Sequence, residues 1–366
     1  MIQIPDLLWR NTFAPAGRTR AALTFAGETR SFETLERRAL RAANALSGLG
    51  IVAGDRVAVM MGNGFAWPEV MFAITSLGAV CVPVNVLLKG REVNHVTADC
   101  GARALIADRV AQAALAELTA LPDTLVRVGE FETPSGRVWH DFETLIAAAA
   151  ETRPSRRPAA TDPAMIYYTS GTTGLPKGAV HSHGGVLWNS FHQIADAALT
   201  PDDVYLLVPS LSWSAGFHDI TLALMSIGGR VAMLPTGGLT IEAIVDAVAR
   251  ERATHTLLVP TLLKQLLATP GACARLRATR LRRIYTGAEV VPPSVMAAVN
   301  AELPDCRVIQ IYGMSEFPLM MTILEAEDGL AHPERTGRAS SIVMLGVQQS
   351  DGCIVAAGSE IGRAHV

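Results

Sequence analysis

Residues 168–178 read YTSGTTGLPKG and combine four Ser and Thr residues, three Gly and one Lys. The apolar run before them, at 164–169, predicts a strand. Glycines let backbone N–H groups approach an anion closely, hydroxyls donate to phosphate oxygens, and a lysine adds a point charge. A solvent-exposed turn would use the same residue types. A Walker A loop is excluded, because Lys177 precedes Gly178 and the G-K-[ST] ending is missing.

Strands and helices alternate on both sides of this stretch. Ser31 is a predicted N-cap for a helix that ends near Gly48 and Gly50. Alternation of this length predicts parallel βαβ units, and hence an α/β fold. Strands are predicted at 56–61, 80–84, 104–108, 164–169, 204–209, 230–234, 256–259, 283–286 and 307–311. Helices are predicted at 68–77, 90–101, 184–198, 218–227, 240–251, 260–269 and 292–302, and the Pro- and Arg-rich segment 151–164 is a predicted boundary.

Composition excludes several classes of protein. Lys and Arg number 31 against 34 Asp and Glu, which argues against a nucleic-acid-binding surface. The five cysteines are scattered and no CxxC occurs, so reduced thiols in the cytoplasm are the simple expectation. Polar residues and prolines interrupt the apolar stretch 57–88, so no membrane span is predicted. Only three of the basic residues are lysines, and Lys177 is one of them.

Four motifs together resemble one family. The order [ST]-[ST]-G-[ST]-T-G-x-P-K is matched at every position from Thr169 to Lys177. Residues 312–316 (YGMSE) resemble Y-G-x-[ST]-E, residues 286–289 (TGAE) resemble a G-A-[PE] segment, and residues 78–85 (GAVCVPVN) resemble G-A-x-x-x-P-[VL]-[ND]. In this order they resemble the AMP-forming adenylate synthetases, which include acyl-CoA synthetases, peptide-synthetase adenylation domains and luciferases. The resemblance extends over residues 20–360.

The resemblance implies a fold and a domain plan. We expect the large N-terminal α/β domain of an acyl-CoA synthetase, with stacked, mostly parallel sheets sandwiched by helices. The expected parts are an α/β subdomain at 1–160, a second at 161–330 with the ATP and acyl sites, and the start of a small β-barrel at 331–360. The family's C-terminal lid domain is absent. Residues 361–366 leave the family pattern and read as a non-native tail, so a truncated, poorly active chain is expected; a natural short protein is the alternative.

The resemblance also implies roles for individual residues. Ser315 would donate to the α-phosphate of ATP, and Glu316 would bind Mg²⁺; with Lys177 these are the expected catalytic residues. The β- and γ-phosphates would be held by Thr169, Ser170, Gly171, Thr172, Thr173, Gly174 and Lys177. Adenine would be bordered by Gly287, Ala288, Glu289, Gln310, Ile311, Tyr312 and Gly313, with Tyr312 stacking on the base.

The implied reaction activates a carboxylic acid with ATP to give acyl-AMP and pyrophosphate, and then transfers the acyl group to coenzyme A. The residues at 83–92 resemble free-standing CoA ligases more than peptide-synthetase modules. An acceptor on a carrier protein, and a non-catalytic nucleotide-binding remnant, are the alternatives. The expected partners are the acid, ATP and coenzyme A, without nucleic acid, and a homodimer is left open.

The acyl pocket is expected around Trp213, Gly216, Phe217, Met314 and Phe317. The family's L-P-x-x-H pattern has lost its histidine here, and W-x-x-G stands at 213–216 instead. Large aromatic side chains would shorten the pocket, although packing of Trp213 under a loop is an equal alternative. His181 and His183 lack a third metal ligand. His192 and His218 are expected on the surface or in packing, and Asp202, Asp203 and Asp219 at turns and helix starts.

Overall fold

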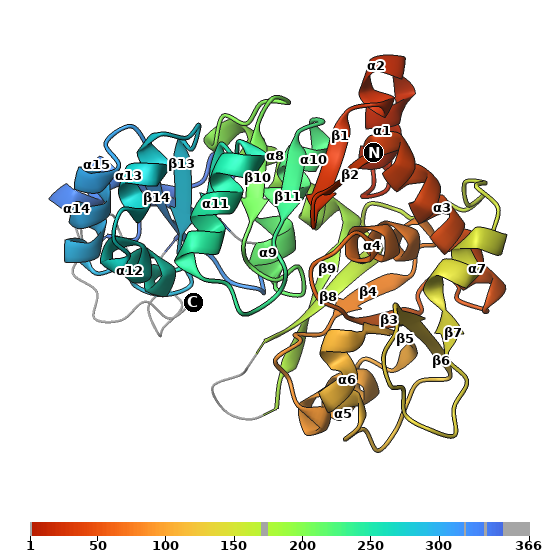
Figure 1. Ribbon diagram of the computed structural model, residues 1–366. Helices are drawn as coiled ribbons and strands as arrows, with labels where there is room; N and C mark the ends of the chain where they lie inside the picture. Colours follow the sequence, from red (N-terminus) through yellow and green to blue (C-terminus); the bar gives the residue numbers. More distant parts are fainter. Residues whose placement is uncertain (1, 170–174, 318–319, 333–334, 347–366) are drawn as a thin grey trace.

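The computed structural model describes residues 2–169, 175–317, 320–332 and 335–346. Figure 1 shows two sheets side by side with helices packed around them. Nine described strands form the larger sheet, in the spatial order β16 (Arg338–Ala339), β15 (Thr322–Glu325), β14 (Arg307–Tyr312), β13 (Arg283–Thr286), β12 (His255–Leu257), β10 (Val204–Leu207), β11 (Arg230–Met233), β1 (Ala21–Phe25) and β2 (Glu28–Ser31). Its centre, from β14 to β1, is parallel, and its edge strands are antiparallel.

The smaller sheet contains seven of the described strands. Their spatial order is β7 (His140–Asp141), β6 (Thr124–Val128), β5 (Ala102–Asp108), β3 (Arg56–Met60), β4 (Val80–Pro83), β8 (Pro163–Thr169) and β9 (Lys177–Ser182). All neighbours are parallel except β8 and β9, which form an antiparallel hairpin. The predicted α/β class with mostly parallel sheets is confirmed, and β9 is a strand that the sequence pattern did not predict.

Helices connect the parallel strands. They are α1 (Asp6–Phe13), α2 (Pro15–Arg18), α3 (Phe32–Gly48), α4 (Ala66–Ser76), α5 (Gly90–Asp99), η1 (Arg109–Ala111), α6 (Gln112–Leu115), α7 (Phe142–Ala148), α8 (His183–Asp196), α9 (Ser214–His218), α10 (Thr221–Ser226), α11 (Ile241–Glu251), α12 (Pro260–Ala268), α13 (Ala272–Arg277), α14 (Pro293–Glu302) and α15 (Ala326–Ala331). The predicted cap of α3 is confirmed, since the Ser31 hydroxyl accepts a hydrogen bond from the Thr34 N–H at 3.2 Å. In the described part of the chain, no helix combines the length and the apolar character needed to cross a bilayer.

Each of the two sheets contains strands from both sides of residue 160. The hairpin β1–β2 precedes that residue, but its strand β1 pairs with β11. The hairpin β8–β9 follows it, and its strand β8 pairs with β4. The subdomains at 1–160 and 161–330 therefore stay a prediction, and the sheets follow a different division. Residues 347–366, which include nearly half of the expected β-barrel segment and all of the expected tail, lie outside the described residues.

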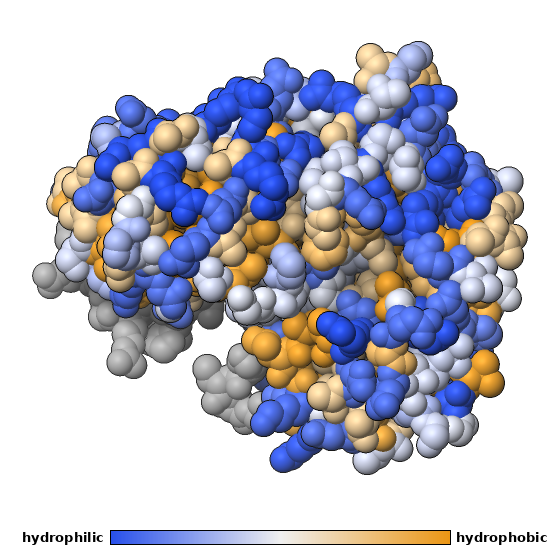
Figure 2. All heavy atoms as spheres, viewed as in Figure 1, coloured by the Kyte–Doolittle hydropathy of each residue, from blue (hydrophilic) through white to orange (hydrophobic). Residues whose placement is uncertain are grey.

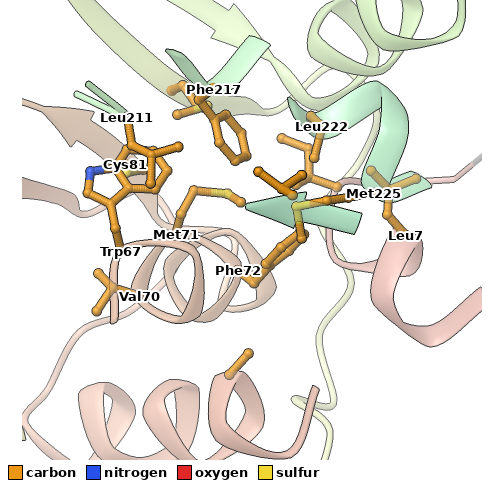
Figure 3. Close-up of a cluster of buried hydrophobic side chains, with 14 of the residues drawn as sticks. Leu7, Trp67, Val70, Met71, Phe72, Cys81, Leu211, Phe217, Leu222 and Met225 are labelled. Carbon is orange, nitrogen blue, oxygen red and sulfur yellow. The ribbon is translucent and has the colours of Figure 1, made fainter. Parts of the chain in front are cut away.

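The main core lies between the sheets around α4. Every α4 residue from Trp67 to Ser76 is buried. Figure 3 shows Trp67, Met71 and Phe72 of this helix facing Phe217 and Leu222 from the other sheet's side of the core. The buried carboxylate of Glu69 is paired with the guanidinium groups of Arg30 and Arg38, because a buried charge needs a partner. This packing fixes one sheet against the other and so sets the shape of the space between their strand ends.

Candidate active site

A cavity of about 520 Å³ opens where the carboxyl ends of several parallel strands meet. Ligands in open α/β sheets bind at such ends. Residues at or just after the ends of β4, β10, β12, β13 and β14 contribute to the wall. Its members are Pro83, Val84, Asn85, Leu88, Glu92, Val96, Tyr167, Tyr168, Thr169, Pro176, Pro209, Ser212, Trp213, Ser214, Ala215, Asp219, Leu257, Val259, Gly287, Ala288, Ile311, Gly313, Met314, Ser315 and Met320. Figure 2 shows a notch in the surface between two halves of the molecule. One half carries α12 and α14, and the other carries α5 and α6.

The Gly- and Thr-rich stretch connects the two strands of the hairpin β8–β9. Thr169 pairs with Lys177 at the end of that hairpin. Thr169 lines the cavity, whereas Lys177 is exposed and is not part of its wall. Ring nitrogen Nε2 of His95 donates a hydrogen bond to the Pro176 carbonyl at 2.8 Å, which ties this hairpin to α5. The expected phosphate-binding residues Ser170, Gly171, Thr172, Thr173 and Gly174 lie outside the described residues.

The turn at 312–316 meets the hairpin through polar contacts. The Thr169 hydroxyl donates to Glu316 Oε1 at 3.4 Å, and the hydroxyls of Ser214 and Ser315 lie 3.1 Å apart. His181 Nε2 donates to the Ser315 carbonyl at 2.7 Å. Burial lowers the pKa of His181, so its ring is neutral at pH 7. Three segments far apart in the sequence are thus joined at one end of the cavity.

The 286–289 segment approaches β14 very closely. A Cβ on Gly287 would collide with the Ile311 carbonyl oxygen, which explains glycine at this position. Ala288 has φ +68°, a left-handed conformation that costs a non-glycine residue about 1 kcal/mol. Of the expected adenine-side residues, Gly287, Ala288, Ile311 and Gly313 line the cavity. Glu289, Gln310 and Tyr312 are not part of its wall; Glu289 is exposed, and the other two are half-buried on or beside the strand.

The expected acyl-pocket residues divide into two groups. Trp213, which is 39% exposed, and Met314 line the cavity. Gly216 and Phe217 do not: a Cβ on Gly216 would collide with the Ser210 carbonyl, and Phe217 is fully buried with its ring 5.1 Å from that of Trp67 (Figure 3). Phe317 is 42% exposed and is also absent from the wall.

The structure places Phe217 in the core and not in the cavity wall. Helix α9 begins at Ser214, and Ser214 and Ala215 line the cavity. Phe217 lies on the same short helix, but its ring packs against Trp67 of α4. Phe217 therefore contributes to the core between the sheets.

Comparison with known proteins shows which family has these features. The model of the AMP-binding enzyme family matches residues 12–363. The chain belongs to this family. An indoleacetate–CoA ligase from Aromatoleum aromaticum is 30% identical over 94% of the chain and 66% of its own length, and a feruloyl-CoA synthase from an Amycolatopsis species is 31% identical over 81% of the chain and 56% of its own length. The chain thus spans about half to two thirds of these relatives.

A solved structure gives the same fold. The inhibitor-bound N-terminal domain of FACL13 from Mycobacterium tuberculosis matches this AMP-binding enzyme with a TM-score of 0.86 and 25% identity, over 97% of the chain and 86% of that domain. The predicted family and fold type are therefore confirmed.

Histidines lie close to the cavity of this AMP-binding enzyme. The His218 ring lies 5.1 Å from Tyr167 and 6.0 Å from His181, centroid to centroid. Burial lowers the pKa of His218 to about 3 and that of His183 to about 4. His183 instead accepts a hydrogen bond at Nδ1 from the Ile4 N–H. Within the described ranges, no group of three His, Cys, Asp or Glu side chains could hold a metal ion.

Asp219 is a wall residue of this AMP-binding enzyme that the sequence pattern expected at a turn or helix start but did not assign to the site. It lines the cavity while being only 1% exposed, and no described group forms a hydrogen bond with its Oδ1 atom. The predicted helix 218–227 is wrong at this point, because Ile220 has φ +61° and separates α9 from α10. The signal in the sequence was an acidic residue within the mostly apolar stretch 215–225.

Proposed function

We propose that this chain binds ATP and a carboxylic acid and forms acyl-AMP, as the larger part of an AMP-forming carboxylate–CoA ligase. The observation that carries the proposal is the meeting of Thr169, Ser315 and Glu316 at one end of a largely apolar cavity. Hydroxyls and a carboxylate suit a phosphate chain with its cation, and apolar walls suit an acyl group. The names of the two curated relatives support the same reaction.

In this proposal the residues act by position and charge. A carboxylate oxygen of the acid attacks the α-phosphorus of ATP, the bond to the β-phosphate oxygen breaks, and pyrophosphate leaves. The Ser315 hydroxyl donates to the α-phosphate, and Thr169 with residues 170–174 and Lys177 holds the β- and γ-phosphates. Fixed donors of this kind stabilise the charge that develops during phosphoryl transfer.

Mg²⁺ fits the same end of the cavity. Glu316 supplies a carboxylate next to the Thr169 hydroxyl, and Mg²⁺ prefers oxygen ligands that include one or two carboxylates and substrate phosphates. Bound there, the ion would neutralise charge on the phosphates. Adenine is assigned to the side of the cavity formed by Gly287, Ala288, Ile311 and Gly313.

Coenzyme A is the proposed second substrate. Its thiol attacks the acyl carbon of acyl-AMP, and AMP leaves with the electron pair of the broken C–O bond. A carrier-protein thiol would undergo the same exchange, and a comparison of the two acceptors decides between them. The names of the two curated relatives favour coenzyme A.

Binding measurements test the proposal on the chain itself. Calorimetric titrations would use ATP with Mg²⁺ and a panel of acyl-sulfamoyl adenosines, which are stable mimics of acyl-AMP, with acetyl, octanoyl, benzoyl, phenylacetyl and indole-3-acetyl groups. We expect at least one mimic to bind about 100-fold more tightly than ATP, because it occupies both parts of the cavity. Glu316→Gln should weaken ATP binding in Mg²⁺ about tenfold, and the exposed Glu302→Gln on α14 should not.

Two results would contradict the proposal. One is a folded chain that binds neither ATP nor any mimic. The other is equal loss of ATP affinity in the Glu316 and Glu302 variants, since Glu302 pairs with Arg277 at an exposed site outside the cavity.

A further inference from the structure

The carboxyl group of Asp219 lies in an unusual position for an acidic side chain. It is 1% exposed, it lines the cavity, and its Oδ1 atom has no hydrogen-bond partner among the described groups. Burying a polar group without a partner is costly, so native structures rarely contain one without a reason. An unmet acceptor at a cavity wall indicates that the partner comes from the molecule that fills the cavity.

The backbone around Asp219 is held in a strained conformation. Ile220 has φ +61°, which is rare for a β-branched residue. The buried Gln193 side chain fixes this segment from both sides: its Oε1 accepts from the Ile220 N–H at 2.7 Å, and its Nε2 donates to the His218 carbonyl at 2.9 Å. Strain of this kind persists where the surroundings enforce it, typically at binding sites. The positive φ of Ile220 separates α9 from α10 and leaves Asp219 in the cavity wall.

The groups that interact with Asp219 are themselves buried. Tyr167, which is almost fully buried, lies on the same face of β8 as Thr169 and one side-chain step further from the phosphate end, a rise of about 7 Å. Burial first, and charges that include Asp219 second, raise the pKa of Tyr167 and of Tyr205. The Tyr205 hydroxyl and both ring nitrogens of His218 also have no hydrogen-bond partner within the part of the chain that the structure describes. The cavity wall also contains the apolar residues Leu257, Val259 and Met320.

We infer that Asp219 selects acids that carry an N–H or O–H group at the end remote from their carboxylate, and that this group donates a hydrogen bond to Asp219. This inference rests on the proposed function, because it places the acyl group in the same cavity. A donor fits Asp219 in either protonation state: a carboxylate offers two acceptor oxygens, and a neutral carboxyl group retains its carbonyl oxygen.

The same contact rejects simple alkyl and aryl acids. An acid without a donor fills the apolar part of the cavity but leaves the Asp219 oxygen buried and unpaired. Sites built to hydrogen-bond a substrate group discriminate strongly against analogues that lack it. Fatty acids and unsubstituted aryl acids are therefore the disfavoured class, and hydroxyaryl or N–H-containing heteroaryl acids are the favoured one.

Matched acyl-sulfamoyl adenosines test this inference by calorimetry. One pair is indole-3-acetyl and 1-benzothiophene-3-acetyl, which differ in the N–H group. The other pairs are the 2-, 3- and 4-hydroxyphenylacetyl mimics and their methyl counterparts. The unmodified chain should prefer the donor member of at least one pair by about tenfold or more. Asp219→Leu should abolish that preference, and Asp219→Asn, whose amide oxygen still accepts, should keep part of it.

Asp202→Leu is the matched control, because Asp202 is an exposed acidic residue on the turn before β10 and should leave the preference unchanged. Circular dichroism and the thermal midpoint of each variant report folding.

Mimics that bind without any donor preference in the unmodified chain would overturn the role of Asp219 while leaving the proposed function intact, and this comparison needs no variant. A preference that survives Asp219→Leu would overturn it as well. Binding of none of the mimics would overturn both.

Discussion

At the scale of single residues, the neutral ring of His181 connects β9 to the turn that carries Ser315 and Glu316. A carbonyl oxygen only accepts hydrogen bonds, so the 2.7 Å contact requires a proton on Nε2 of His181. The lowered pKa of His181 keeps the ring in that neutral form at pH 7. The ring is thus a positioning group that holds the turn against the hairpin, and it does not touch the proposed substrates.

We expect His181→Leu to weaken ATP binding about fivefold, because a hydrogen bond worth about 1 kcal/mol is lost. His181→Gln should retain most of the affinity, since the amide can donate to the same carbonyl. Calorimetric titration with ATP and Mg²⁺ measures both variants. Equal affinity of the leucine variant and the unmodified chain would show that the turn is held without His181.

Single-residue roles could be predicted from the sequence only in part. The motifs placed Thr169, Gly287, Ala288, Met314 and Ser315 at one cavity. They did not show that Phe217 packs in the core, and they could not give the direction of the Asp219 side chain, because that direction depends on the positive φ of Ile220 and on its contact with Gln193. A strained residue fixed by a distant side chain leaves no periodic pattern to read.

At the scale of helices and strands, the N-cap of α3 gives a direct test of local stability. Ser31→Ala removes the acceptor for the Thr34 N–H and should lower the free energy of unfolding by about 1 kcal/mol. Ser47→Ala, at an exposed position in the last turn of the same helix, should leave it unchanged or raise it slightly, because alanine favours helix. Urea unfolding followed by circular dichroism measures both variants, and equal destabilisation would refute the assigned cap.

The strands β10 to β14, and helices such as α3, were predictable because each carries its own local pattern. Several other strands were not. Strand β9 (KGAVHS) is mostly exposed and lacks an apolar run, so only its pairing with β8 makes it a strand. The hairpin β1–β2 was missed for a similar reason, since its pairing with β11 joins residues about 200 positions apart.

At the scale of the whole molecule, buried histidines link stability to pH. His183 accepts a hydrogen bond from the backbone of Ile4 and so joins α8 to the start of the chain. Burial lowers its pKa from 6.5 to about 4. Between these values the unfolded chain binds a proton that the folded chain does not, so His183 makes the fold less stable as the pH falls below 6.5.

We expect this contribution to reach about 1 kcal/mol between pH 7.5 and pH 5.5. Urea unfolding of the unmodified chain and of His183→Gln at both pH values measures it. The unmodified chain should lose more stability than the variant between these pH values. Other groups, such as Glu69 and Asp219 with their raised pKa values, contribute equally to the pH dependence of both proteins, so their effects cancel in that comparison. An equal change in both proteins would rule out His183 as the cause.

The pairing of strands that lie far apart in the sequence has a consequence for synthesis on the ribosome. Strand β1 pairs in parallel with β11, and Leu23 lies opposite Val231. At about 5–20 residues per second, the N-terminal hairpin must wait roughly 10–40 seconds before its partner strand is made. Throughout that interval the apolar side chains of β1 have no sheet to join. The apolar side chains of β1 therefore stay without their partner strand until β11 has been translated, and we expect them to need protection during that time.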